Sequence, residues 1–365
     1  MPFSRRDLLA GLLTTAPLFA AKPHAEIALA GGKIYPSPHQ PSIPEGVVIL
    51  RDGFVAAVGP VNKTHIPSKA LVVDCRGAFV LPGFTNASVD LSGRQWTPAA
   101  KLPAAALADH MEATLNRWGF SFAYDMAVTP NTADLIRRIE ANQLPGPTIR
   151  RAARDADADA LLLSLSDPIE KIRTTTAEAH RRQKLAFARP TSRQEALNAV
   201  LGGADVLIHP PPRSFSFEPQ LLREMIDRKV AFVPALHLYE LEAQTLGLDA
   251  EESQAWVLTA QDQVRAFAAA GGQILFGTNI GTGSDCNPTR EYLLLAESGL
   301  LPMEILATLT TAPSGRFAES RVRGQLAPGF VADVTVLQAD PAEDVRNFAA
   351  VRLNLRNGRV LFRTT

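Results

Sequence analysis

The feature that most constrains the fold is an alternation of short apolar runs with helical stretches between residues 84 and 315. The runs that we interpret as strands are FTNASVDL, FSFAYDM, PTIRRA, DALLLSLS, KLAFAR, DVLIH, AFVPALH and QILFGTN. Helices are expected between them, for example near 103–118 and 131–141. Strands that alternate with helices pair in parallel. Eight such units predict an α/β fold, a (β/α)8 TIM-type barrel with its active site at the carboxyl ends of the strands.

One connection does not fit a regular barrel. Only a handful of residues separate PTIRRA from DALLLSLS, whereas a parallel crossover usually needs about 10–12 residues or more. We therefore expect the barrel to be trimmed or distorted between its third and fourth strands.

The segments before and after this alternation have a β pattern. GVVILRDGFVAAVG is interpreted as a hairpin that turns at Asp52-Gly53, because Asp-Gly between apolar strands is a strong turn signal. VRLNLRNGRVLF is interpreted in the same way, with its turn at Asn357-Gly358. β-rich segments are therefore expected on both sides of the barrel segment.

Residues 1–25, MPFSRRDLLAGLLTTAPLFAAKPHA, have the pattern of an export signal. A basic start precedes an apolar stretch from Leu8 to Ala21, and the SRRDLL run resembles a twin-arginine signal. Cleavage is expected between Ala20 and Ala25. An ordinary Sec signal and an uncut membrane anchor are the alternatives. The prediction is a bacterial protein that is periplasmic or secreted.

Charge and composition restrict the kinds of molecule that this protein is expected to bind, and the two cysteines allow an expectation about disulfides. Lys+Arg and Asp+Glu number 37 each, so no basic face for nucleic acid is implied. No apolar run reaches the roughly 18 residues that span a bilayer, so no integral membrane span is expected after signal cleavage. Cys75 and Cys286 are expected to be unpaired, mostly buried thiols. A small-molecule ligand or substrate is the expected partner, and oligomerisation is left open.

Several motifs together resemble the amidohydrolase superfamily, and in particular its imidazolonepropionase-like and prolidase-like members. They are GVVILRDGFVAAVG, VVDCRGAFVLPGF, GPTIRR, GGADVLIHP, ILFGTN and GQLAPGFVADVTVLQADPAEDV. The resemblance implies a barrel over about 84–315 and a β-sandwich built from 26–83 and 316–365. It also implies one or two metal ions that activate water to hydrolyse a C–N bond.

The resemblance further implies a set of metal ligands at the strand ends. They are His-x-His on the first strand, a carboxylated lysine on the fourth, histidines on the fifth and sixth, and an aspartate on the eighth. In this sequence the matching positions hold, in chain order, Ser88 and Asp90, Leu162 or a neighbour, Arg189, His209 and Asn279.

These changes predict a degenerate metal site. A catalytic zinc site typically has about three protein ligands, and only His209 and Asp90 remain as candidates. Arg189 would repel a cation, and Asn279 cannot act as a general base. We therefore predict no cofactor, the loss of metal-dependent hydrolysis and a pseudoenzyme. The alternative is a hydrolase of amide, lactam or dipeptide C–N bonds with one weakly held divalent metal, zinc or manganese, or none.

Three interpretations of the residues at these strand ends stay open besides metal chemistry. In the first, the site has drifted and Arg189 simply pairs with Asp90. In the second, Arg189, Asn279 and His237 bind a carboxylate or another polar ligand, since a guanidinium fork suits carboxylates.

The third interpretation is hydrolysis without a metal. Ser88, His209 and Asp90 are the residue types of a nucleophile, its base and an orienting acid. Their sequence spacing makes the required geometry hard to reach, because Ser88 and Asp90 are two apart on one strand. The candidate catalytic residues are thus His209, Asp90, Asn279 and Ser88.

Overall fold

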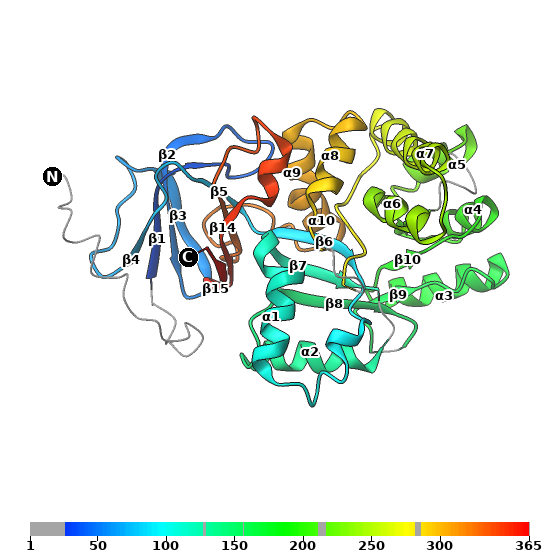
Figure 1. The fold of residues 1–365 in the computed structure, drawn as a ribbon, viewed down its shortest axis with the longest axis horizontal. Coiled ribbons are helices and arrows are strands. Elements are labelled where there is room, and N and C mark those ends of the chain that lie inside the picture. The colour runs from blue at the N-terminus through cyan, green and yellow to red at the C-terminus, as the bar shows by residue number, and fades with distance from the viewer. Residues whose placement is uncertain (1–25, 127–128, 156, 211–216, 282–285, 365) are drawn as a thin grey trace.

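The computed structural model describes residues 26–126, 129–155, 157–210, 217–281 and 286–364. Figure 1 shows a β-sheet domain beside a barrel that is covered by helices. The barrel sheet is parallel and has the order β12-β11-β10-β9-β8-β7-β6. Its strands are β6 (Phe84–Val89), β7 (Phe120–Asp125), β8 (Thr148–Ala153), β9 (Ala160–Leu162), β10 (Ala186–Ala188), β11 (Val206–Ile208) and β12 (Ala231–Val233).

Residues 273–280 close the barrel between β12 and β6. The Leu275 N–H donates to the Phe232 carbonyl at 2.8 Å, and the Phe276 carbonyl accepts from the Ala87 N–H at 2.7 Å. These contacts form parallel bridges on both sides rather than a continuous ladder. The predicted (β/α)8 barrel is therefore confirmed, with an eighth member that is less regular than the run QILFGTN suggested.

Helices follow most of the barrel strands. The helices near 103–118 and 131–141 are present. At the start of α4 the Ser192 hydroxyl accepts from the Glu195 N–H at 3.3 Å and caps the helix. In the described ranges no helix is long and apolar enough to cross a membrane. The helices are α1 (Ala104–Thr114), α2 (Pro130–Glu140), α3 (Ile169–Arg181), α4 (Arg193–Leu201), α5 (Pro219–Asp227), α6 (Leu236–Thr245), α7 (Ala250–Ala269), α8 (Thr289–Glu297), α9 (Pro302–Leu309) and α10 (Thr311–Arg316), with short 3-10 turns η2 (Arg94–Trp96), η3 (Asn116–Trp118) and η4 (Val345–Ala349).

The expected irregularity lies between β8 and β9. The described residues of this link, 154–155 and 157–159, form no helix. Ala160 pairs with Ala152, so β9 begins level with the end of β8 and the chain does not need to return along the whole strand. This stagger explains how a short link can join two parallel neighbours.

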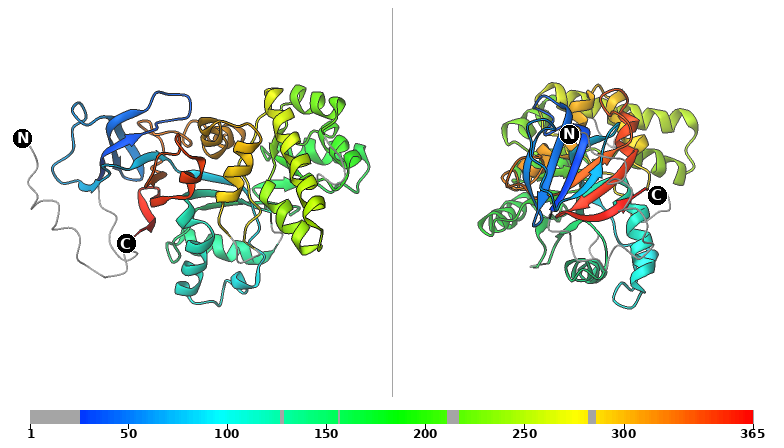
Figure 2. Two further views of the ribbon diagram at one scale, coloured as in Figure 1. Left: turned by 45° about the horizontal axis from the view of Figure 1, so that its top comes forward. Right: turned by 90° about the vertical axis from the view of Figure 1, so that its left-hand side faces the viewer.

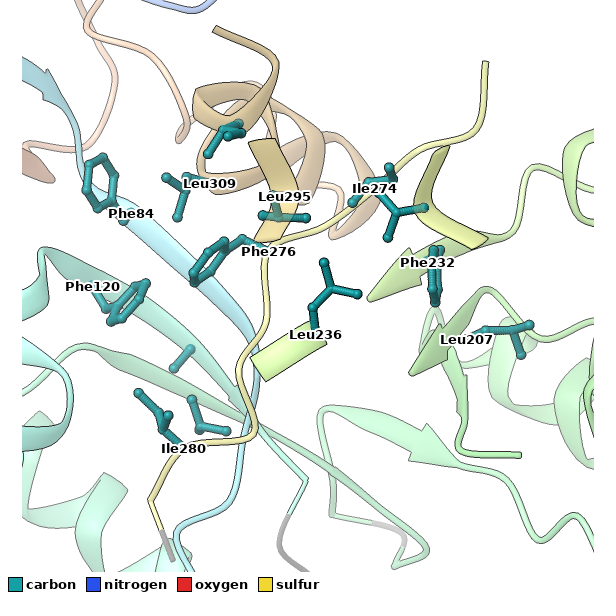
Figure 3. Close-up of a cluster of buried hydrophobic side chains, with 14 of the residues drawn as sticks. Phe84, Phe120, Leu207, Phe232, Leu236, Ile274, Phe276, Ile280, Leu295 and Leu309 are labelled. Carbon is teal, nitrogen blue, oxygen red and sulfur yellow. The ribbon is translucent and has the colours of Figure 1, made fainter. Parts of the chain in front are cut away.

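Two apolar layers hold the barrel together. Figure 3 shows Phe84, Phe120 and Phe276 close to Leu295 and Leu309, which come from the covering helices α8 and α9. The inner layer takes at least one side chain from each strand and from the closing segment, as packed barrel interiors do: Ala87, Phe122, Ala152, Ala160, Phe187, Val206, Ala231 and Leu275.

The second sheet joins both ends of the described chain. β5 pairs with β13 in antiparallel fashion, with Val80 opposite Val336, and Figure 2 shows the two sets of strands side by side. The predicted hairpin turns are present, with Asp52 at φ 51° and Asn357 at φ 51°. Cys75, in this domain, does not form a disulfide with Cys286. The strands are β1 (Glu26–Ile34), β2 (Ile43–Arg51), β3 (Phe54–Pro60), β4 (Leu71–Asp74), β5 (Phe79–Pro82), β13 (Val334–Leu337), β14 (Val351–Arg356) and β15 (Arg359–Arg363).

Candidate functional site

The site predicted from the sequence lies where the barrel strands end, and we call this region the mouth. Ser88 and Asn279 are neighbours there, because the Asn279 N–H donates to the Ser88 carbonyl at 2.8 Å. Gly277 packs so closely between β6 and β12 that an added Cβ would lie 3.2 Å from Ser88 Cβ and 2.4 Å from a Val233 methyl. The Val233 carbonyl accepts the His209 N–H at 3.0 Å. Ser88, Asn279 and His209 therefore belong to one side of the mouth.

Arg189 and His209 follow the adjacent strands β10 and β11. Arg189 is exposed, whereas His209 has an exposed fraction of only 4%. Burial, together with the nearby Arg189 charge, lowers the pKa of His209 well below its usual range. The imidazole is therefore neutral, with one nitrogen able to donate a hydrogen bond and the other able to accept one.

Several buried polar atoms of the mouth have no hydrogen-bond partner in the described part of the chain. They are the Ser88 hydroxyl, both ring nitrogens of His209 and the side-chain carbonyl of Asn279. A buried polar group left without a partner costs about 1–3 kcal/mol, and protein interiors normally avoid this. Their concentration at one place indicates a site built for a polar molecule.

The backbone of the mouth is also strained. His209, Ala235 and Asn279 have φ angles of 46°, 49° and 54°. This left-handed region is unfavourable for residues with a Cβ. His209 and Ala235 follow β11 and β12, and Asn279 lies near the end of the closing segment. Strain of this kind gathers at functional sites.

Asp90 has a different role from those considered for it. Its Oδ1 accepts from the Ser92 hydroxyl at 2.5 Å and from the Ser92 N–H at 3.0 Å. No ion pair joins Asp90 to Arg189 among the described residues, so the interpretation in which the two pair is wrong. Ser88 and His209 are not hydrogen-bonded to each other or to Asp90, so the arrangement required for the metal-free triad is not formed.

His237 lies in the first turn of α6 and is held by a charged network. Its Nδ1 is 2.9 Å from Glu240 Oε2, and Arg290 donates to Glu240 from Nε at 3.0 Å and from Nη2 at 2.6 Å. The Glu291 carboxylate accepts the N–H groups of Leu236 at 2.9 Å and His237 at 2.7 Å. Burial raises the pKa of Glu291 to about 7. A ligand role for His237 stays a prediction.

Two residues near the mouth have no marked signal in the sequence. The Tyr239 hydroxyl donates to the Pro210 carbonyl at 2.8 Å, which fixes the chain just after His209. Burial raises the pKa of Glu242, and the Arg189 charge opposes that shift. Both side chains come from α6, which lies against the mouth. Their i, i+3 spacing places them on one helix face. That spacing is the one sequence signal that could have linked the two residues.

The donors at the mouth do not fit a divalent metal. His209 is a single imidazole beside a guanidinium, Asp90 is engaged by Ser92, and Leu162 has no donor atom. Across the ranges that the structure describes, no group of three or more His, Cys, Asp or Glu side chains could hold a metal ion. A catalytic zinc typically takes about three protein ligands. We therefore derive no chemical step through a metal.

Comparison with known proteins supports the fold. No protein-family model and no curated protein matches the chain. Among solved structures, a Xaa-Pro dipeptidase with bound methionine is similar with a TM-score of 0.79, 15% identity, and coverage of 93% of this chain and 100% of that one. A prolidase complexed with N-methylphosphonate-L-proline is similar with a TM-score of 0.75, 19% identity, and coverage of 93% of this chain and 100% of that one. Ochratoxinase from A. niger is similar with a TM-score of 0.75, 15% identity, and coverage of 93% of this chain and 96% of that one.

These structures define the class of fold. The barrel and the second β-domain, built from strands that precede and follow it, match the architecture of these solved structures, so the expected fold is confirmed. These neighbours are a Xaa-Pro dipeptidase, a prolidase and an ochratoxinase. At this level of identity the similarity establishes the fold, and activity is a separate question.

Proposed function

We propose that this protein binds a small polar or anionic molecule at the barrel mouth and has lost metal-dependent hydrolysis. The observation that carries the proposal is the group of buried, unpartnered polar atoms on Ser88, His209 and Asn279. Arg189 follows the neighbouring strand β10, is exposed and has no ion pair among the described residues, and its charge acts on His209. The mouth thus combines buried neutral polar groups with an exposed positive one.

The arrangement favours a ligand with two kinds of group. A guanidinium fork at the rim suits a carboxylate, which it can bind through two parallel hydrogen bonds. The neutral His209 and the Ser88 hydroxyl can each donate and accept, while the free oxygen of Asn279 accepts. An amide meets these deeper groups well, because it carries both a donor and an acceptor. A small carboxylate that contains an amide is therefore a suitable probe.

Metal content is the first test of the lost activity. The protein is purified from medium supplemented with zinc and manganese, and metal per chain is measured by elemental analysis. The expected result is no stoichiometric metal, in the parent protein as in His209→Ala. A stoichiometric metal that disappears in both His209→Ala and Asp90→Ala would contradict the proposal and favour the hydrolase of amide, lactam or dipeptide bonds.

Ligand binding is the second test, with N-acetylglycine as the probe. Calorimetry is expected to show saturable binding that weakens at least about tenfold in Arg189→Gln, as loss of a charged hydrogen bond implies. Arg181→Gln is the matched control, because Arg181 is exposed on α3 and outside the mouth. Release of acetate during the titration would instead show that the amide bond is cut.

The proposal includes export, to the periplasm or the medium. Residues 1–25 lie outside the described ranges, so the support is their sequence alone. In a bacterial host with a twin-arginine system, the Arg5→Lys, Arg6→Lys double variant is expected to stay in the cytoplasm with its signal uncut. Unchanged export of this variant would favour the Sec alternative.

A further inference from the structure

A second candidate site lies between the sheet domain and the barrel. It is a cleft of about 620 Å³ whose walls include the hairpin turn at Asp52, the turn at Asn357, the end of α2 and the start of β8. Because Thr148 begins β8, the cleft opens at the end of the barrel opposite the mouth. Figure 1 shows β15, which follows the second turn, close to this end of the barrel.

The walls of the cleft are held in place by hydrogen bonds. The Gly53 carbonyl accepts the Ala332 N–H at 2.8 Å, and the Ala332 carbonyl accepts the Gly358 N–H at 2.8 Å. The Asn357 N–H donates to Asp333 Oδ1 at 2.9 Å. Ala332 therefore joins the two turns. The walls of the cleft are thus in place without a ligand.

The lining has two chemical characters. Ile27, Leu50, Ile139 and Ile149 provide apolar, nearly buried surface. The charged lining residues are four arginines against two acids: Arg51, Arg150, Arg356, Arg359, Asp52 and Glu140. A cleft that is partly apolar and also presents guanidinium donors suits a molecule with both an apolar body and an anionic group.

Two of these arginines have hydrogen-bonding capacity left over. Arg356 donates from Nη1 to the Pro147 carbonyl at 3.2 Å, but its buried Nε has no partner. Arg359 donates to the neutral side chain of Asn142. Neither forms an ion pair within the described ranges. Burial lowers the pKa of Arg356, and the nearby Asp333 carboxylate opposes that shift.

The other two arginines are partly neutralised. Arg51 is 2.5 Å from Glu26, and Arg150 is 3.4 Å from Asp159. Arg356 and Arg359 lie on either side of the Asn357-Gly358 turn, and the two lining acids, Asp52 and Glu140, balance their charge without forming an ion pair with them among the described residues. The cleft therefore offers unused guanidinium donors rather than a net positive charge.

We propose that this cleft binds an organic anion that has an apolar body and a carboxylate, phosphate or sulfonate group. A guanidinium is suited to such oxyanions because its donors match their geometry. The size falls within the range of about 300–1,000 Å³ that is usual for small-molecule sites. The cleft and the mouth share no lining residue among those described, so this site is independent of the proposed function.

The test is calorimetric titration with 2-naphthoate, neutral 2-naphthamide and inorganic phosphate. We expect saturable binding of 2-naphthoate and at least tenfold weaker binding of the amide. Arg359→Gln is expected to weaken 2-naphthoate binding at least tenfold. Arg363→Gln is the matched control, because Arg363 lies on the same strand β15, is exposed and is outside the cleft.

Four results would overturn the proposal. They are the absence of saturable 2-naphthoate binding, an equal loss in Arg363→Gln, a loss that occurs in Arg189→Gln rather than in Arg359→Gln, and phosphate binding as tight as that of 2-naphthoate. The third would assign the probe to the mouth, and the fourth would remove the role of the apolar wall. Arg359 is exposed, so its substitution leaves the fold intact, and circular dichroism confirms this for each variant.

Discussion

Left-handed backbone occurs in two contrasting settings in this protein. In the sheet domain it is found at the hairpin turns, where Asp52-Gly53 and Asn357-Gly358 are residue types that such turns favour. At the barrel mouth it is found at His209 and Ala235, whose Cβ atoms make it unfavourable. The sheet domain follows local preference, whereas the mouth violates it.

Buried polar groups show the same contrast. In the sheet domain the Asp340 carboxylate accepts from Lys33 Nζ at 2.8 Å, from the Tyr35 hydroxyl at 2.7 Å and from the Ala342 N–H at 2.9 Å. At the mouth, the Ser88 hydroxyl and the His209 ring have no partner among the described residues. The Asp340 cluster is arranged for stability, whereas the mouth holds unmet hydrogen-bonding capacity, which is the usual compromise at a binding site.

The largest expected effect lies in the sheet domain. Asp340→Ala removes a buried acceptor and leaves the Tyr35 hydroxyl and the Lys33 ammonium without their partner. Loss of a buried, charge-assisted group of this kind lowers the free energy of unfolding by about 2–4 kcal/mol. Urea denaturation measures it. Glu170→Ala, which breaks the exposed pair with Arg173 on α3, is the control and is expected to change little. Equal effects of the two variants would remove the contrast.

The next largest expected effect is a pH dependence of the free energy of unfolding that arises from His209 at the mouth. The folded-state pKa of His209 lies well below 6.5, so on acidification the unfolded chain takes up a proton that the folded protein does not. This contribution to stability is present above pH 6.5 and is lost as the pH falls below it. Between pH 7.5 and 5.5 the loss is at most about 1.4 kcal/mol, the limit for a folded state that takes up no proton. His209→Gln is expected to reduce the pH dependence by up to this amount.

The control for the pH effect is His65→Gln, because His65 is exposed in the sheet domain. Denaturant midpoints are measured at both pH values for the parent and the two variants. A His209→Gln variant that keeps the parent pH dependence would show that the imidazole is solvated, and it would contradict the buried, neutral site.

The sequence predicted the periodic parts of the fold well. β9 was found from DALLLSLS and the turns from Asp52-Gly53 and Asn357-Gly358, since these signals are local. The partner of Asp90 and the role of Glu291 depend on which surfaces meet after folding. Glu291 precedes an apolar helix face and caps α6 from 54 or 55 residues away. No local pattern encodes such a contact, so the residue types of the mouth were foreseen but their partners were not.

The smallest effect is also the most diagnostic, because it concerns two buried serines with opposite expected signs. Ser88→Ala removes a hydroxyl that has no partner, so the free energy of unfolding is expected to rise by up to about 1 kcal/mol. Ser298→Ala removes a hydroxyl that donates to the Leu294 carbonyl at 2.7 Å, so stability is expected to fall by about 0.5–1.5 kcal/mol. Thermal denaturation compares the two variants.

Ser88→Ala should also weaken the binding of N-acetylglycine, because the group that destabilises the empty protein is the one that a ligand would satisfy. A Ser88→Ala variant that is destabilised as much as Ser298→Ala would show that the Ser88 hydroxyl is already paired.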